Sequence, residues 1–339
     1  MYRPSTSRRE FLHRASGGFG SVALSGLWST VQAQSHNPLG ARHGHHAPRA
    51  DRVIFLYSTG GVSHVDTFNH RPQLAVDHGK SITASRWLNK SGEFKRYLIK
   101  PHWSFKQYGE SGTWVSELFP HLGSVIDDVC VLNAMHCESD GHDKATLAAH
   151  TGSAQFARPS AGSWVSYGLG TENQNLPGFI SLCPPDNVGG AQNYGSAFLP
   201  AFYQGTKIGQ FNQNIRTASL RNLGNQQISG KLQRKQLDFV QSLNRELLQR
   251  KKQSSQIEGV IESYELAFRM QKAAPDVLDL TDESQATLDA YGMERPEPTD
   301  VKSAHGGGTG VYQTISRNCL LARRLVERGV RFVPLMPLS

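Results

Sequence analysis

The sequence has 339 residues, of which 38% are hydrophobic, and 36 Lys and Arg against 28 Asp and Glu give a formal net charge of +8. This length and apolar content predict one large domain with a sizeable core. The basic residues form no stripe with interleaved aromatic residues, so composition argues against a nucleic-acid-binding protein. The four cysteines form no CxxC pair, which argues against a structural zinc knuckle.

Residues 1–33 carry the three regions of a twin-arginine signal peptide. Arg8 and Arg9 precede an acidic residue and Phe-Leu, residues 17–31 are weakly apolar, and Ala33 closes a small-residue cleavage site. The alternative is a soluble helix start with a chance arginine pair. We expect the twin-arginine translocase to export the protein to the periplasm or cell envelope. A membrane span needs about 20 apolar residues, so no stable span is expected.

Residues 34–50 are polar, rich in His and contain Pro. This composition predicts a flexible linker between the signal peptide and the domain. Its histidines could instead bind a metal weakly.

The domain begins with a near-continuous apolar run over residues 52–57, followed by Gly60 and Gly61. Such a run is typical of a strand buried on both faces of a parallel sheet, and ligands bind at the carboxyl ends of such strands. Residues 70–112 have no clear period and are expected to form an irregular excursion over the site. Helical spacing of apolar residues predicts a helix over 116–126.

Four short segments continue this pattern. Residues 129–132 are predicted to form a second buried strand, and residues 145–150 a short helix closed by Gly152. An amphipathic helix over 164–169 and a third strand over 179–182 follow.

The second half is mostly helical. Residues 186–228 read as loops, residues 231–272 as a long helical region with a break near residues 254–255, and residues 281–291 as a helix capped by Thr281. Residues 293–310 are expected to form another loop.

A last helix over 311–328, stopped by Gly329, leads into a strand over 330–336. Helices and buried strands therefore alternate along the chain. This order predicts an α/β fold over residues 51–339, with a mostly parallel sheet and helices on both faces.

The first cluster of reactive side chains is Ser63, His64 and Asp66, just past the glycine pair. A local Ser-His-Asp triad is disfavoured, because a triad needs side chains that converge from separate segments. In an extended loop, His64 and Asp66 would point the same way and could bind one metal ion. The alternative is an Asp that caps the turn under a packed His.

The second cluster is His136, Asp140, His142, Asp143 and His150, which also follows a predicted strand. Imidazole and carboxylate ligands suit a divalent metal such as Zn, Ca or Mn. His142 and Asp143 would lie near a helix N-terminus, where a phosphate or sulfate ester fits. Hydrogen-bonded loop histidines are the alternative, and His150 is expected to be structural. We expect His64, Asp66, His136 and Asp140 to be the metal ligands.

Residues 193–206 are rich in aromatic residues and Gly. They suit a pocket wall, so Asn193 and Tyr203, together with Ser63, are candidate substrate-binding residues. A packed core loop explains the same composition.

Long motifs at residues 52–68, 136–152, 162–179, 195–206 and 319–332 resemble a secreted domain-of-unknown-function family, number fifteen-oh-one. This family is placed in the alkaline phosphatase/sulfatase superfamily. The resemblance implies a parallel α/β sheet with divalent metals at strand carboxyl ends. It also implies hydrolysis or transfer of phosphate and sulfate esters.

The resemblance departs from the superfamily at two positions. Thr59 and Gly60 stand where metal-binding aspartates follow the first strand, and Asp66 comes later. His142 stands where a Ser, Thr or Cys nucleophile is expected, so it is the candidate catalytic residue or a metal ligand. Attack by a metal-bound water would need no side-chain nucleophile.

The family also implies a second half, beyond residue 333, that carries further Asp and His ligands. Residues 333–339 differ from that continuation. We therefore expect a C-terminally truncated chain that cannot assemble a two-metal site.

The leading hypothesis is an exported, metal-dependent hydrolase of sulfate or phosphate esters, inactive if truncated. The rival is a non-catalytic envelope protein that binds a sulfated or phosphorylated glycan or another partner. A serine esterase acting through Ser63 is a third possibility.

Overall fold

The computed structural model describes residues 37–87, 90–186, 188–209, 228–251, 254–297 and 311–336. Arg8, Arg9 and Ala33 of the predicted signal peptide lie outside the described residues. Within these ranges, no helix is long and apolar enough to cross a membrane.

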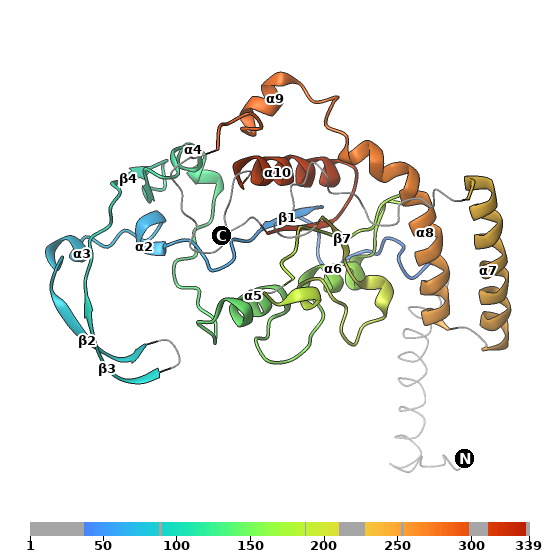
Figure 1. Cartoon of the computed structure of the whole chain (residues 1–339), viewed down its shortest axis with the longest axis horizontal. Coiled ribbons are helices and arrows are strands. Elements are labelled where there is room, and N and C mark those ends of the chain that lie inside the picture. The colour runs from blue at the N-terminus through green and yellow to red at the C-terminus, as the bar shows by residue number, and fades with distance from the viewer. Residues whose placement is uncertain are drawn as a thin grey trace, which may run out of the picture.

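A parallel sheet of four strands, in the order β1-β8-β6-β7, forms the centre of the molecule (Figure 1). Its strands are β1 (Val53–Leu56), β6 (Ile180–Leu182), β7 (Thr206–Ile208) and β8 (Phe332–Leu335). The prediction of an α/β fold with a parallel sheet is therefore confirmed.

Helices cover both faces of this sheet. α10 (Val311–Glu327) contacts β8 and β1, whereas α6 (Ala161–Leu169) contacts β8 from the opposite side (Figure 1). The core between the sheet and its helices is made of buried aliphatic side chains, among them Ile180, Leu182, Val277, Leu320, Leu321, Leu325 and Leu335. Burial of these side chains is the main stabilising term for the domain.

β1 forms where the sequence predicts it, but it is not buried on both faces. Among the described strands it pairs with β8 alone. Val53 is 43% exposed and Leu56 is 58% exposed. The prediction of a strand buried on both faces is therefore wrong, since β1 lies at the edge of the described sheet and has one neighbouring strand there.

The irregular excursion predicted over residues 70–112 contains regular structure. A short helix, α3, precedes two antiparallel strand pairs, β2–β3 and β4–β5. Their bounds are α3 (Gln73–Val76), β2 (Ser81–Trp87), β3 (Lys90–Tyr97), β4 (Phe105–Tyr108) and β5 (Thr113–Ser116). Gly109 and Gly112, both with φ of 64°, make the reversal between β4 and β5 possible.

The helix predicted over residues 116–126 is replaced by α4 (Pro120–Gly123) and a 3-10 turn, η1 (Ile126–Asp128). Pro120 lacks a backbone N–H, so it can begin a helix but cannot continue one. The strand predicted over residues 129–132 is also wrong, because this segment pairs with no described strand. Leu132 there is 66% exposed.

The glycine signals at helix ends are confirmed. α5 (His142–Thr151) begins three residues before its predicted start and ends at Gly152, whose φ is 74°. Gly170, with φ of 63°, closes α6. These left-handed conformations carry a steric cost for residues with a Cβ.

The long helical region divides where predicted, into α7 (Gly230–Arg250) and α8 (Ser255–Leu278). α9 (Gln285–Ala290) is capped by Ser284 rather than Thr281, since the Ser284 side chain accepts a hydrogen bond from the N–H of Thr287. The final helix and strand follow as predicted.

Candidate functional site

The carboxyl end of β1 meets the N-terminus of α5. A Cβ placed on Gly60 would lie 3.0 Å from both Cε1 and Nδ1 of His142. Gly60 also has φ of 83°, a conformation that glycine adopts readily. The loop after the first strand and the first turn of α5 are therefore in direct contact, although 82 residues separate Gly60 from His142.

Further contacts hold α5 against β1. The Tyr57 hydroxyl donates to Oγ1 of Thr146 at 3.2 Å. The ring of His150 packs on Phe55 and Tyr57, with centroids 5.2 and 4.9 Å apart. Its Nδ1 lies 2.9 Å from the carbonyl oxygen of Thr146, and burial lowers the pKa of His150. These contacts give His150 a packing role, as expected.

The N-terminus of α5 is open to a ligand. Its N-cap is Gly141, which has no side chain to accept hydrogen bonds from the first-turn N–H groups. His142, Asp143 and Lys144 are all exposed there. The first-turn N–H groups and the positive end of the helix dipole favour an anion, while Lys144 adds a positive charge and Asp143 a negative one.

Thr59 is a candidate that the residue patterns alone did not identify. Its side chain is 5% exposed, and Oγ1 has no hydrogen-bond partner among the described residues. Buried hydroxyl groups without a partner are uncommon in native proteins. Thr59 directly precedes Gly60. The superfamily resemblance implies a metal-binding residue directly after the first strand, and this correspondence could have identified Thr59 from the sequence.

Ser63, His64 and Asp66 lie in a different arrangement from the one predicted. They belong to the one-turn helix α2 (His64–Thr67), in which residues i and i+2 do not face each other. Oγ of Ser63 donates to Oδ2 of Asp66 at 2.6 Å. The extended-loop geometry assumed for a His64–Asp66 pair is therefore wrong, and Ser63 contacts Asp66 instead.

His136 and Asp140 are exposed in the segment before α5. In the described part of the chain, no three His, Cys, Asp or Glu residues gather into a group that could hold a metal ion. Within these residues, no three of His64, Asp66, His136 and Asp140 are therefore brought together in this way, and their role as metal ligands stays a prediction. A bound Zn, Ca or Mn ion stays a prediction.

Asn193 and Tyr203, the other predicted substrate-binding residues, are buried. Asn193 ends the turn η2 (Gly190–Asn193) beside α5, where its Nδ2 donates to the carbonyl of Val188 at 2.7 Å. Tyr203 ends the turn η3 (Ala201–Tyr203) and is 4% exposed. Both side chains are buried within the chain, which agrees with the alternative of a packed core loop, and Oδ1 of Asn193 has no hydrogen-bond partner among the described residues.

The partners of Tyr203 come from the segment predicted to be a linker. Its hydroxyl donates to the carbonyl of Pro38 at 3.1 Å and accepts from Nη2 of Arg42 at 3.3 Å. Gly40 forms a bridge with Thr171, just after α6. These contacts dock residues 37–42 on the domain, which the composition of the linker did not predict.

Cys183 follows β6 directly at the carboxyl edge of the sheet. Its φ of 46° is unusual for a residue with a Cβ. Burial raises the pKa of the Cys183 thiol to about 11, so the thiol stays protonated near neutral pH. A buried, protonated thiol of this kind is a poor nucleophile.

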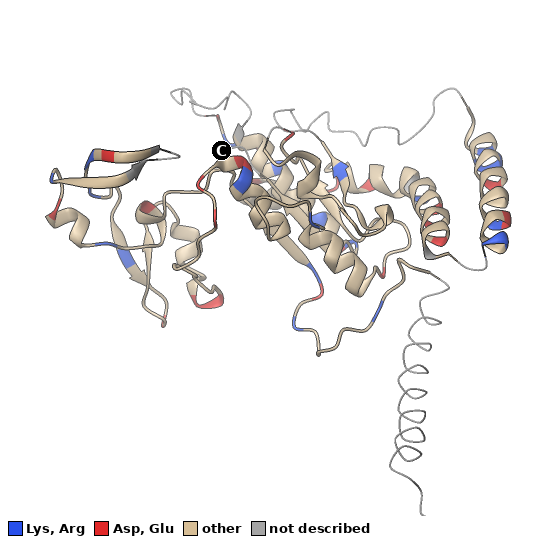
Figure 2. Ribbon diagram, turned by 90° about the horizontal axis from the view of Figure 1, so that it is seen from below, with Lys and Arg blue, Asp and Glu red and all other residues tan. Residues whose placement is uncertain are grey.

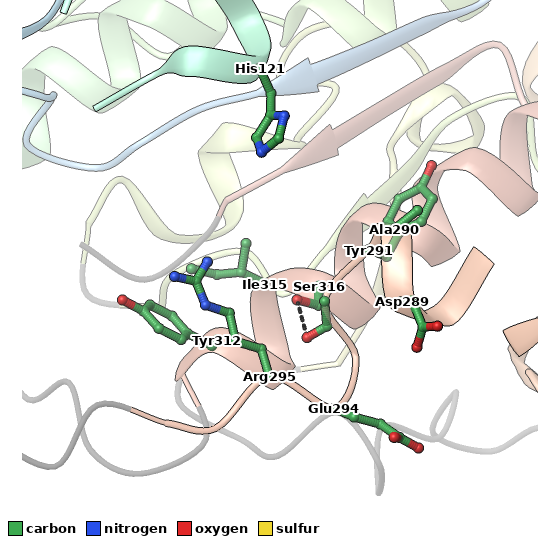
Figure 3. A pocket seen from close by; sticks show the side chains of 10 residues that line it. His121, Asp289, Ala290, Tyr291, Glu294, Arg295, Tyr312, Ile315 and Ser316 are labelled. Carbon is green, nitrogen blue, oxygen red and sulfur yellow. Dashed lines mark hydrogen bonds between the residues drawn. The ribbon is translucent and has the colours of Figure 1, made fainter. Parts of the chain in front are cut away.

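A cavity of about 670 Å³ opens between α9, α10 and His121 of α4 (Figure 3). The Arg295 guanidinium lies 5.1 Å from the centre of the Tyr312 ring, and Oγ of Ser316 donates to the carbonyl of Gly292 at 3.4 Å. Figure 3 shows Glu294 pointing away from these side chains. None of the residues predicted for the site lines this cavity.

One family model, described as a protein of unknown function (DUF1501), matches residues 50–337. No curated protein and no solved structure matches the chain significantly.

Proposed function

The chain belongs to the DUF1501 family, and from this premise we propose an exported protein of the alkaline phosphatase/sulfatase type that binds phosphate or sulfate esters. The proposed export route is the twin-arginine translocase, which would deliver the protein to the periplasm or cell envelope. The proposed substrate is a sulfated or phosphorylated compound such as a glycan.

The observation that carries this proposal is the contact between His142 and Gly60 at the carboxyl end of β1. Parallel sheets bind ligands at this edge, and the uncapped N-terminus of α5 opens beside it. A tetrahedral phosphate or sulfate group carries several oxygen acceptors, which suit several N–H donors at once.

Four groups have roles in this proposal. The first-turn N–H groups of α5 would bind the ester oxygens, and Lys144 would supply a positive charge. The Thr59 hydroxyl, which has no partner within the described chain, would donate a further hydrogen bond. His142 would position the anion, or transfer a proton to the leaving oxygen if the ester is hydrolysed. These contacts do not depend on the predicted divalent metal.

The test is binding and turnover on the same preparation. Calorimetry should detect vanadate or phosphate binding, and His142→Ala should weaken it about tenfold or more, since hydrogen bonds to charged groups contribute about 1.5–3 kcal/mol. Turnover of aryl phosphate and aryl sulfate is measured with and without added Zn, Ca or Mn. Wild-type protein that binds neither anion would disprove the proposal.

Two glycines supply a matched control for the geometry. Gly60→Ala and Gly61→Ala both introduce a Cβ at positive φ, with φ of 83° and 73°. Only the Cβ at Gly60 would meet the His142 ring, because nothing lies within 4 Å of that position at Gly61. Gly60→Ala should therefore weaken anion binding more than Gly61→Ala. Equal effects would show that the contact is not part of the site.

A second candidate is binding of an anionic glycan without catalysis. It is favoured by the first turn of α5, whose residues His142, Asp143 and Lys144 include no Ser, Thr or Cys nucleophile. In that case a sulfated polysaccharide should bind and be recovered unchanged, with or without added metal.

A further inference from the structure

One face of α7 is fully used in packing against α8. Nη1 of Arg234 donates to Oε2 of Glu265 at 2.8 Å, and Nε2 of Gln241 donates to the carbonyl of Ile261 at 2.8 Å. The Gln241 side chain is fully buried in this contact. The orientation of α7 about its own axis is therefore set by polar contacts.

A second face of α7 is apolar and exposed. We call it the α7 stripe, and it consists of Leu232 (45% exposed), Phe239 (65%), Val240 (39%), Leu243 (50%) and Leu247 (44%). The spacings of 7, 8, 11 and 15 residues from Leu232 place these side chains on one side of the helix. Contiguous exposed apolar side chains of this kind are typical of surfaces that bind another protein, a membrane or a ligand.

The charges of α7 are mostly positive. Residues 231–251 contain six basic and two acidic side chains, a net charge of +4. Both acidic side chains, Asp238 and Glu246, are paired within the helix, with Arg234 and Arg250. The basic side chains that form no ion pair with a described residue are Lys231, Lys235, Arg245 and Lys251.

Cations also lie along the α7 stripe itself. Lys235 precedes Phe239 by four residues and Lys251 follows Leu247 by four, so each lies beside the stripe. Arg250 lies on the same side of the helix but is paired with Glu246. A helix with an apolar side bordered by basic residues is typical of proteins that lie on an anionic membrane surface.

The position of α7 would allow a flat partner such as a membrane to reach it. Figures 1 and 2 both place it at an outer end of the molecule, beyond α8. A second copy of α7 is a poorer occupant of the stripe. Parallel pairing would bring Lys235 against Lys235, and the net charge of +4 on each copy of the helix opposes pairing in either orientation.

We propose that the α7 stripe docks the protein on an anionic lipid surface, with the apolar side chains inserted at the headgroup boundary and the basic residues on the phosphates. This is peripheral attachment, and it is independent of the anion site at α5. Its strength should fall with added salt, because the screening length is about 10 Å at 0.1 M ionic strength.

The experiment is co-sedimentation of the full chain with vesicles of phosphatidylglycerol and phosphatidylcholine, against vesicles of phosphatidylcholine alone. Phe239→Ser with Leu243→Ser should lower partitioning onto the anionic vesicles at least about tenfold, the change that corresponds to about 1.4 kcal/mol. Lys235→Glu should reduce binding to anionic vesicles and leave binding to neutral ones unchanged. Hydrogen–deuterium exchange should show protection of residues 230–250 when anionic vesicles are present.

Val76→Ser is the matched control, since Val76 is an exposed apolar residue (67% exposed) on α3, outside the stripe. It should bind vesicles as the wild type does. Equal vesicle binding by the wild type and the double variant would overturn the proposal. So would a dimer that dissociates in the double variant while neither protein sediments with vesicles, because the stripe would then bind a second copy.

Discussion

A hydrogen atom in place of a Cβ at Gly60 lets the His142 ring lie against the backbone after β1. Glycine pairs after a strand and histidines before a helix are both visible in the sequence, and both were predicted to belong to a site. Their contact could not be predicted, because it depends on how α5 is placed on β1. Asp66 shows the opposite case, since it was expected to bind a metal together with His64 but accepts a local hydrogen bond from Ser63 at the start of the one-turn helix α2.

Because of His150, the free energy of unfolding of the protein should depend measurably on pH. Burial lowers its folded-state pKa, whereas the unfolded state keeps an ordinary value of about 6.5. As the pH falls, the unfolded chain binds a proton first. The stability contribution of the neutral ring is therefore complete above about pH 6.5 and is lost as the pH falls through the lowered folded-state pKa, with a slope of at most about 1.4 kcal/mol per pH unit.

Urea unfolding of wild-type protein and His150→Gln between about pH 8 and about pH 5 tests this expectation. Below about pH 6.5, the unfolding free energy of the variant should fall less steeply with decreasing pH than that of the wild type. His121→Gln changes an exposed histidine on α4 and serves as the control. Identical pH profiles for the wild type and His150→Gln would contradict the assignment.

Among the elements, α6 shows how closely a helix can approach the sheet. Its Gly162 lies against the ring of Phe179, which is 2% exposed next to β6. Gly205 approaches the same ring, where a Cβ would come within 2.7 Å. Small residues at these positions are visible in the sequence, but the sequence does not reveal which aromatic ring they contact.

Two alanine substitutions in α6 should therefore have opposite effects. A Cβ on Gly162 would lie 2.6 Å from ring atoms of Phe179, so Gly162→Ala should destabilise the protein by about 1–3 kcal/mol through overpacking. Gly168 has nothing within 4 Å of the same position, so Gly168→Ala should stabilise the helix by up to about 1 kcal/mol. Free energies of unfolding from urea titrations measure both, and changes of the same sign would contradict this packing.

At the scale of the whole molecule, Arg324 joins α10 to the segment between α8 and α9. The Arg324 side chain is 3% exposed, and its Nη1 lies 2.5 Å from Oε1 of Glu283 and 2.7 Å from Oδ1 of Asp282. Arg323 donates to Glu283 as well, at 2.7 Å, and these hydrogen bonds lower the pKa of Glu283. The network therefore joins α10 to the C-terminal end of α8 and the residues that follow it.

The two acidic partners of Arg324 should contribute unequally. Glu283 is 9% exposed, so Glu283→Gln leaves a buried cation poorly compensated and should cost about 3–5 kcal/mol of unfolding free energy. Asp282 is 64% exposed, and Asp282→Asn should lower the unfolding free energy much less than Glu283→Gln because water screens that pair. Thermal and urea unfolding of the two variants measure the difference, and similar losses would argue against a buried network.

The sequence by itself determined the α/β class, the places of β1, β6 and β8 and the ends of α5, α6 and α10, because glycine conformations and apolar periodicity act over a few residues. It also pointed to the two segments that meet at the carboxyl end of β1. Only the tertiary structure decided which side chains touch there, that β1 lies at the edge of the described sheet, and that Tyr203 contacts residues 37–42 instead of a pocket. Those outcomes depend on contacts between residues far apart in the chain, and no local pattern encodes the geometry of such contacts.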